Sequence, residues 1–226
     1  KRHDLRFYCF TDDGSGLHPN IMVKPLPVLD VKPEDNKYYY RKEAGLCDNN
    51  LGGLKGQRVL FFDIDVVITG ELDSVIEYPN KDEFLIINDW ASFGNNVGQA
   101  SCYSWVVGTL GFVKNDFEKD PKKWIKKFYT ASQEYLSYKI IERFGKLNFW
   151  PEEWMSSFKF SCLPIWFLRP FVTPRLPKHT KVLAFHGDPK VEDAIAGRWS
   201  KEVPLWKRIY KTIRPSLWLK KYVMFK

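Results

Sequence analysis

The chain has 226 residues, 44% of them hydrophobic and 27% charged, which is the composition of a folded globular protein and excludes a disordered or fibrous chain. The net charge of +8 is confined to residues 198–226, which hold nine Lys or Arg and one acid, while residues 1–197 hold equal numbers of both signs. No apolar run is long enough to predict a transmembrane helix. The four widely spaced cysteines form no C-x-x-C pair, so we expect reduced, mostly buried thiols and no zinc site.

Hydrophobic patterning predicts strands that alternate with helices. Strands are expected at residues 5–10, 21–23, 58–68, 84–87, 105–113 and 182–185, and helices at 34–47 and 119–144. Pro121 is expected near a helix start. The strand at 58–68 is the clearest, because its continuous apolar start is typical of a strand covered on both faces. The alternation predicts an α/β fold, expected here as a mixed, mostly parallel sheet flanked by helices.

Two aspartates, Asp63 and Asp65, interrupt this strand. Residues one apart in a strand point to the same face, and ligand sites of α/β proteins form where such strands end. Two adjacent carboxylates repel each other unless a cation neutralises them, and Mg²⁺ or Mn²⁺ bound with a substrate phosphate does so. The alternative is a pair of solvated acids at a strand end, which the surrounding apolar run disfavours because unpaired charge there is costly.

The stretch RVLFFDIDVVITGEL at 58–72 resembles the D-x-D strand of GT-A glycosyltransferases, most closely that of bacterial family 8-like enzymes. Further similarity follows in the same order at residues 10–13, 39–42, 132–136, 151–159 and 185–190. The resemblance spans roughly residues 5–200 and implies a GT-A, Rossmann-like domain at 1–197 that lacks the first β-α unit, followed by a basic aromatic helical tail at 198–226. Ser132 stands where the family has Asp, and Val191 where it has Pro, which puts a donor-sugar contact in doubt.

The resemblance implies transfer of a sugar from a nucleotide-diphosphate sugar, typically a UDP-sugar, to a glycan or lipid-linked acceptor. It implies Mn²⁺ or Mg²⁺ as cofactor, with Asp63, Asp65 and His186 as ligands. Donor contacts are expected from Thr11, Asp12, Arg41, Lys42, Asp63, Asp89 and Lys190. Gln133 would lie at the reacting carbon of a retaining enzyme, whereas an inverting one needs a carboxylate base, Glu134 or Asp89.

The segment 198–226 interleaves six Trp, Tyr or Phe residues with its nine cations. Basic segments rich in aromatics are typical of proteins that bind anionic membrane surfaces. The alternative is a C-terminal helix packed on the core by its aromatic face; nucleic acid is a less favoured polyanion. We expect a cytoplasmic protein, peripheral at the inner membrane.

Two other functions stay open. In a haloacid dehalogenase-type phosphatase, Asp63 would be the nucleophile and Asp65 the acid/base, with Asp188 and Asp193 forming the last motif. That motif normally opens its domain, whereas strand-like sequence precedes Asp63 here. The third possibility is a non-catalytic protein that binds a sugar nucleotide or a membrane.

Overall fold

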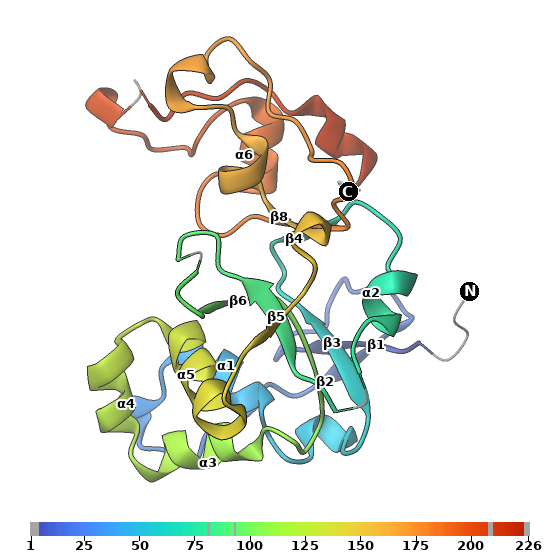
Figure 1. Ribbon diagram of the computed structural model, residues 1–226, viewed down its shortest axis with the longest axis vertical. Coiled ribbons are helices and arrows are strands. Elements are labelled where there is room, and N and C mark those ends of the chain that lie inside the picture. Colours follow the sequence, from blue (N-terminus) through green and yellow to red (C-terminus); the bar gives the residue numbers. More distant parts are fainter. Residues whose placement is uncertain (1–4, 81, 93, 208–209, 224–226) are drawn as a thin grey trace.

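The computed structural model describes residues 5–80, 82–92, 94–207 and 210–223, without the side chains of residues 38 and 205. Figure 1 shows two lobes, a lower one built on the larger sheet and its helices and an upper one that contains the C-terminal part of the chain. The mixed α/β class is confirmed. The expected mostly parallel sheet is wrong: the described strands form three sheets, and three of their six pairings are antiparallel.

The sheet of the lower lobe has the order β3 (Arg58–Phe62), β6 (Gly98–Val106), β5 (Leu85–Asn88) and β7 (Asn148–Phe149). Alternate side chains of β3 enter different cores. Val59 and Phe61 pack on the core shared with the helices, and Leu60 and Phe62 pack on the opposite face around Val75. The prediction that this strand is covered on both faces is confirmed.

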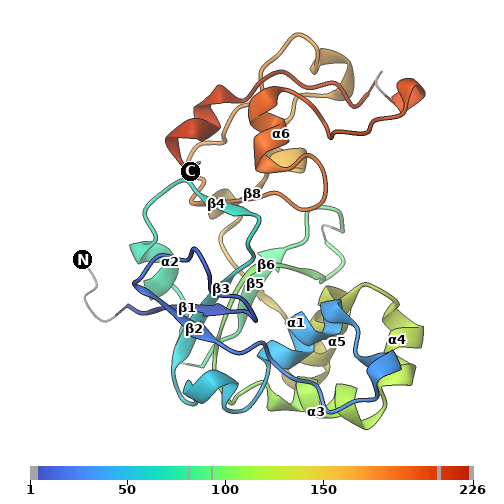
Figure 2. The same cartoon turned by 180° about the vertical axis from the view of Figure 1, so that it is seen from behind.

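Four helices gather on one side of this sheet in Figure 1: α1 (Tyr38–Leu46), α3 (Gly111–Lys119), α4 (Pro121–Phe128) and α5 (Ser132–Phe144). The short α2 (Asp73–Glu77) contributes Val75 to the other face. Helix α4 starts at Pro121 as expected, and the Asp120 side chain caps it by accepting from the Lys123 amide. A separate parallel pair, β1 (Phe7–Phe10) and β2 (Ile21–Lys24), lies in front of β3 in Figure 2.

The strand expected at 105–113 is misplaced. The chain forms β6 at Gly98–Val106, turns at Gly108 with φ of +101°, and begins α3 at Gly111. The first half of β6 is rich in small and polar residues, which hides it from a search for apolar runs. Small residues are required there, because a Cβ on Gly98 would lie 2.5 Å from Ile86 Cδ1.

The upper lobe contains the sheet β4 (Val66–Ile68), β9 (Val182–Ala184) and β8 (Met155–Ser157), together with α6 (Val191–Ala196). Short helical turns complete the fold: η1 (Pro33–Asp35), η2 (Leu51–Gly53), η3 (Glu152–Trp154), η4 (Phe158–Cys162), η5 (Trp166–Leu168), η6 (Leu205–Lys207) and η7 (Leu217–Lys221). No helix of the described residues is both long enough and apolar enough to cross a bilayer. The thiols of Cys47, Cys102 and Cys162 are buried and free, as expected.

The C-terminal segment packs on the upper lobe. Trp199, Ile213 and Leu219 are buried in the same cluster as Val67 and Leu183. The C-terminal tail was expected to be helical, and the described part of the segment forms two separate helical turns. These side chains therefore pack on the core, which was the alternative to membrane binding. Residues 208–209 and 224–226 of the predicted membrane-binding tail lie outside the described residues. The domain boundary at residue 197 stays a prediction.

Candidate functional site

The two aspartates lie where the chain passes from the lower sheet to the upper one. The expected strand at 58–68 is divided into β3 and β4, and the turn between them holds Asp63, Ile64 and Asp65. The Asp63 amide donates to the Ser101 carbonyl in the lower sheet (2.9 Å), whereas the Asp65 carbonyl accepts from the Phe185 amide in the upper sheet (2.9 Å). The backbones of the two aspartates are therefore hydrogen-bonded to different sheets.

Asp63 is paired with a lysine of α1. Lys42 Nζ lies 2.6 Å from Asp63 Oδ2 and 3.3 Å from Glu43 Oε1. Glu43 is almost fully buried, and Ser132 Oγ donates to its second oxygen at 2.7 Å. Burial raises the pKa of the Glu43 carboxyl, although the Lys42 charge and the Ser132 hydroxyl oppose the shift. Ser132, which departs from the family pattern, thus connects α5 to α1 through Glu43.

Asp65 has a different environment. Its Oδ2 lies 3.3 Å from Lys190 Nζ, while its Oδ1 is buried with no hydrogen-bond partner among the described residues. A buried carboxylate oxygen without a partner is costly, and functional sites are where such atoms are found. Asp65 thus retains an oxygen that could accept a further ligand.

His186 follows β9 and lies within electrostatic reach of Asp65. Its ring is stacked between Trp90 and Phe160, each 5.7 Å away between centroids. Nε2 lies 2.9 Å from Ser157 Oγ, so the ring is held on three sides. Burial, helped by the nearby Lys159 charge, lowers the pKa of His186, although the carboxylates of Asp89 and Asp65 oppose this. The lowered pKa favours the neutral imidazole, which is the form that binds metals.

Further groups surround His186. Lys159 Nζ donates to the His186 carbonyl at 3.0 Å, and a Cβ on Gly187 would lie 3.4 Å from the same ammonium. Asp89 is buried at the end of β5, where its amide donates to the Val97 carbonyl. Lysines and carboxylates thus face His186 from several elements.

The structure brings together only part of the predicted donor site. Gln133 Oε1 accepts from the Ala100 amide at 3.4 Å, next to the residue that holds the Asp63 backbone. Glu134 is exposed on α5. Thr11 follows β1, where its hydroxyl and Asp13 bond to each other in a local turn, and Asp12 next to it is exposed.

Lys42 rather than its neighbour Arg41 contacts Asp63. Sequence reasoning gave no role to the neighbours of the site, namely Glu43, Trp90, Ser157, Lys159 and Phe160. Two of them, Ser157 and Lys159, belong to the resembling stretch 151–159, which was a usable signal. The aromatic rings around His186 carry no such signal, because their stacking depends on the tertiary fold.

Among the described residues, no group of three or more His, Cys, Asp or Glu side chains is arranged to hold a metal ion. Asp63, Asp65 and His186 are nevertheless of ligand types that Mn²⁺ accepts, namely carboxylate oxygen and imidazole nitrogen. Lys42 and Lys190 contact the two carboxylates with their ammonium groups. At Asp65 a divalent cation could use the unpaired Oδ1, whereas at Asp63 Oδ2 it would compete with Lys42.

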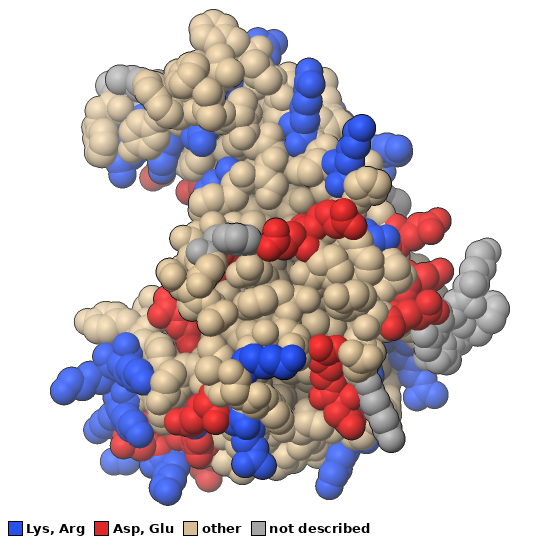
Figure 3. Space-filling view, in the orientation of Figure 1, with Lys and Arg blue, Asp and Glu red and all other residues tan. Residues whose placement is uncertain are grey.

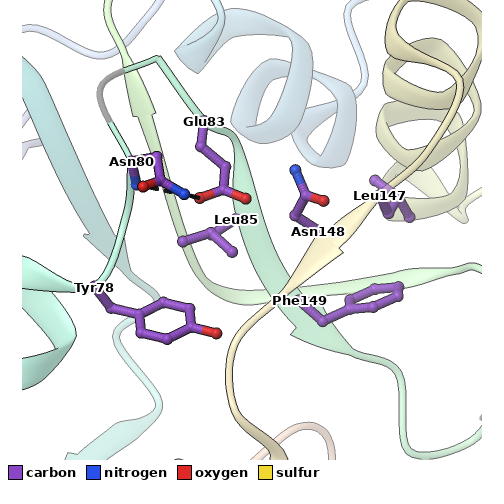
Figure 4. Close-up of a pocket in the computed structure, with 7 residues that line it drawn as sticks. All are labelled: Tyr78, Asn80, Glu83, Leu85, Leu147, Asn148 and Phe149. Carbon is purple, nitrogen blue, oxygen red and sulfur yellow. Dashed lines mark hydrogen bonds between the residues drawn. The ribbon is translucent and has the colours of Figure 1, made fainter.

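Two cavities lie at opposite ends of β5. One of about 370 Å³ is lined by Tyr78, Asn80, Glu83 and their neighbours, and none of the predicted site residues lines it (Figure 4). The second, of about 330 Å³, has Trp90, Trp150, Glu152 and Glu153 in its wall, together with Asn88, whose buried Oδ1 has no partner among the described residues. Trp90 joins the second cavity to His186, so that cavity belongs to the candidate site.

A comparison with known protein families finds no matching family, and a comparison with curated proteins finds no matching protein. The function must therefore be argued from the residues of the site.

Proposed function

We propose that this chain is a metal-dependent glycosyltransferase that moves a sugar from a nucleotide-diphosphate sugar, with a UDP-sugar as the first donor to test, to a glycan or lipid-linked acceptor. The observation that carries the proposal is a pair of aspartates at the border of two sheets, each in contact with a lysine, with His186 within electrostatic reach of Asp65. Alternating carboxylates and ammonium groups suit a diphosphate bound through a cation, because each charge then has a partner of opposite sign.

In this proposal Asp63, Asp65 and His186 hold Mn²⁺ or Mg²⁺, which when bound neutralises the charge that develops on the leaving diphosphate. Lys42 and Lys190, which lie beside the two carboxylates, would supply positive charge to the phosphate oxygens. Gly187 has φ of +73° and no side chain, so its backbone can approach a phosphate closely.

The acceptor sugar would occupy the cavity beside Trp90. Indole rings stack on the apolar face of a sugar, and Trp90 and Trp150 both line this cavity. For an inverting reaction Asp89 is better placed than Glu134, because Asp89 is buried within electrostatic reach of His186 while Glu134 is exposed on α5. For a retaining reaction Gln133 stays the proposed group.

The phosphatase alternative has less support. It needs Asp193 free to act with Asp63, but the Asp193 carboxylate is paired with Arg198 at 2.5 Å. A phospho-aspartate at Asp63 would nevertheless establish the phosphatase. A non-catalytic binding protein would give cation and nucleotide binding without turnover.

The test is a panel of nucleotide sugars with Mn²⁺, followed by donor hydrolysis and thermal shift. We expect one donor to raise the melting temperature only when Mn²⁺ is present, and Asp65→Ala to lose both the shift and the hydrolysis. Asp30→Ala removes an exposed carboxylate outside the site and should behave like the wild type. A response that needs no metal, or that survives Asp65→Ala, contradicts the proposal.

A further inference from the structure

An apolar surface on the upper lobe faces solvent. Five large side chains of the segment around η5 are between 38 and 76% exposed, and we call them the aromatic patch: Ile165, Trp166, Phe167, Leu168 and Phe171. Single exposed apolar residues are common on proteins, but a contiguous group of this size usually marks a binding surface. Trp206, from the C-terminal segment, is 66% exposed as well.

The C-terminal segment fixes the shape of the patch. Arg169 donates through Nη1 to the Tyr210 carbonyl at 2.9 Å, and its guanidinium lies over the Trp199 ring. Trp218 Nε1 donates to the Pro174 carbonyl at 2.8 Å. The aromatic patch is therefore held in place before any partner arrives, and the segment predicted to bind membranes serves as its support.

The charge of the upper lobe is predominantly positive. Residues 154–187 contain five Lys or Arg and no acidic residue. Over residues 155–223 there are fourteen Lys or Arg and four Asp or Glu, a net charge of +10 that exceeds the +8 of the whole chain. Figure 3 shows the top of this lobe as a broad uncharged surface bordered by Lys and Arg side chains.

We propose that the aromatic patch docks the upper lobe on the surface of an anionic lipid bilayer. Trp and Phe rings beside cations match the boundary between headgroups and acyl chains, where apolar rings are buried and ammonium and guanidinium groups meet lipid phosphates. A second copy of the chain fits less well, because two lobes of +10 would repel each other. The proposal needs neither donor nor cation and is independent of the proposed activity.

Docking would bring the candidate site close to the bilayer. Phe160, in the turn η4 that precedes the patch, stacks on His186. A short stretch of chain thus joins the lipid-facing surface to the site, as a lipid-linked acceptor would require.

The test is co-sedimentation of the full chain with vesicles of phosphatidylcholine, with and without phosphatidylglycerol. We expect binding only to the anionic vesicles. Replacing Trp166, Phe167 and Phe171 by Ala should weaken it by roughly a hundredfold or more, because three partly buried rings are lost. The matched control, Tyr129→Ala with Phe144→Ala, removes exposed rings of the lower lobe and should leave binding unchanged.

A second pair of variants tests the charge. Arg175→Gln with Lys207→Gln should weaken binding by about 25-fold, since each cation near an anionic leaflet contributes about fivefold. Lys122→Gln with Lys126→Gln, on α4 of the lower lobe, is the control. The proposal is overturned if the wild type stays in the supernatant or if the triple variant sediments with vesicles as the wild type does. It is also overturned if the wild type is a dimer that ignores vesicles and the triple variant is a monomer in sedimentation velocity.

Discussion

Replacing Lys42 by Met tests the charge network beside the aspartate pair. The ammonium of Lys42 neutralises both Asp63, which is partly exposed, and Glu43, whose side chain is only 4% exposed. Met keeps much of the length of the side chain and removes the charge. The variant leaves Glu43 buried with hydrogen bonds from Ser132 and from its own backbone amide, but with no counter-charge.

The expected loss follows from burial. Breaking a fully buried ion pair costs about 3–5 kcal/mol, and because a third of the Lys42 side chain is exposed we expect about 2 kcal/mol here. The loss must depend on pH. Burial already raises the pKa of Glu43 above its ordinary 4.5, and removal of Lys42 raises it further. The folded state then holds the proton more tightly than the unfolded state, so the deficit grows as pH rises through the folded pKa and shrinks toward pH 4.5.

Urea denaturation followed by tryptophan fluorescence at several pH values from 5 to 8 measures this. Lys42→Met with Glu43→Gln should recover most of the lost stability at high pH, since no buried charge is left unpaired. Lys126→Met, an exposed lysine of α4, should change the free energy of unfolding by less than about 0.5 kcal/mol. A deficit that is equal at every pH and is not relieved in the double variant would refute the reasoning.

Three further outcomes are expected. Gly98→Ala should lower the free energy of unfolding by about 1–3 kcal/mol because the new methyl group meets Ile86, and Ile86→Val should relieve part of the loss in denaturant titrations. In a thiol-reagent assay Cys9, which is partly exposed, should react quickly, and the other three cysteines only on unfolding, because burial raises the pKa of each of them. A chain ending before Arg198 should bind a hydrophobic dye and lose thermal stability, because it uncovers the core of the upper lobe; equal dye binding by both chains would contradict the packing described.

The sequence was informative where local pattern and tertiary environment agree. The apolar run of β3 predicts a strand covered on both faces, and Pro121 predicts the start of α4. Strand β6 was misplaced because its first half lacks large apolar residues; Gly98, at its start, is required by the close approach of Ile86, which no local pattern records. The antiparallel pairings of β6 likewise depend on tertiary contacts.

The site was predictable to a similar degree. Asp63, Asp65 and His186 came from the motifs, and the structure places Asp65 within electrostatic reach of His186. The contact between Lys42 and Asp63 needed α1 to be placed against β3. The burial of Glu43 could not be predicted from the sequence of α1, because charged and aromatic residues both precede it there and no buried face stands out.

The turn at Asp63 and Asp65 has a mechanical consequence. One aspartate belongs by its backbone to the lower sheet and the other to the upper sheet, so a tilt of one lobe against the other changes the separation of the two carboxylates. A ligand that binds both aspartates would restrict the orientation of the two lobes relative to each other. It would bind most tightly at one such orientation. Small-angle scattering with and without Mn²⁺ and donor would detect this restriction as a narrower range of shapes. Unchanged scattering with bound ligand would show that the two lobes already have a fixed orientation.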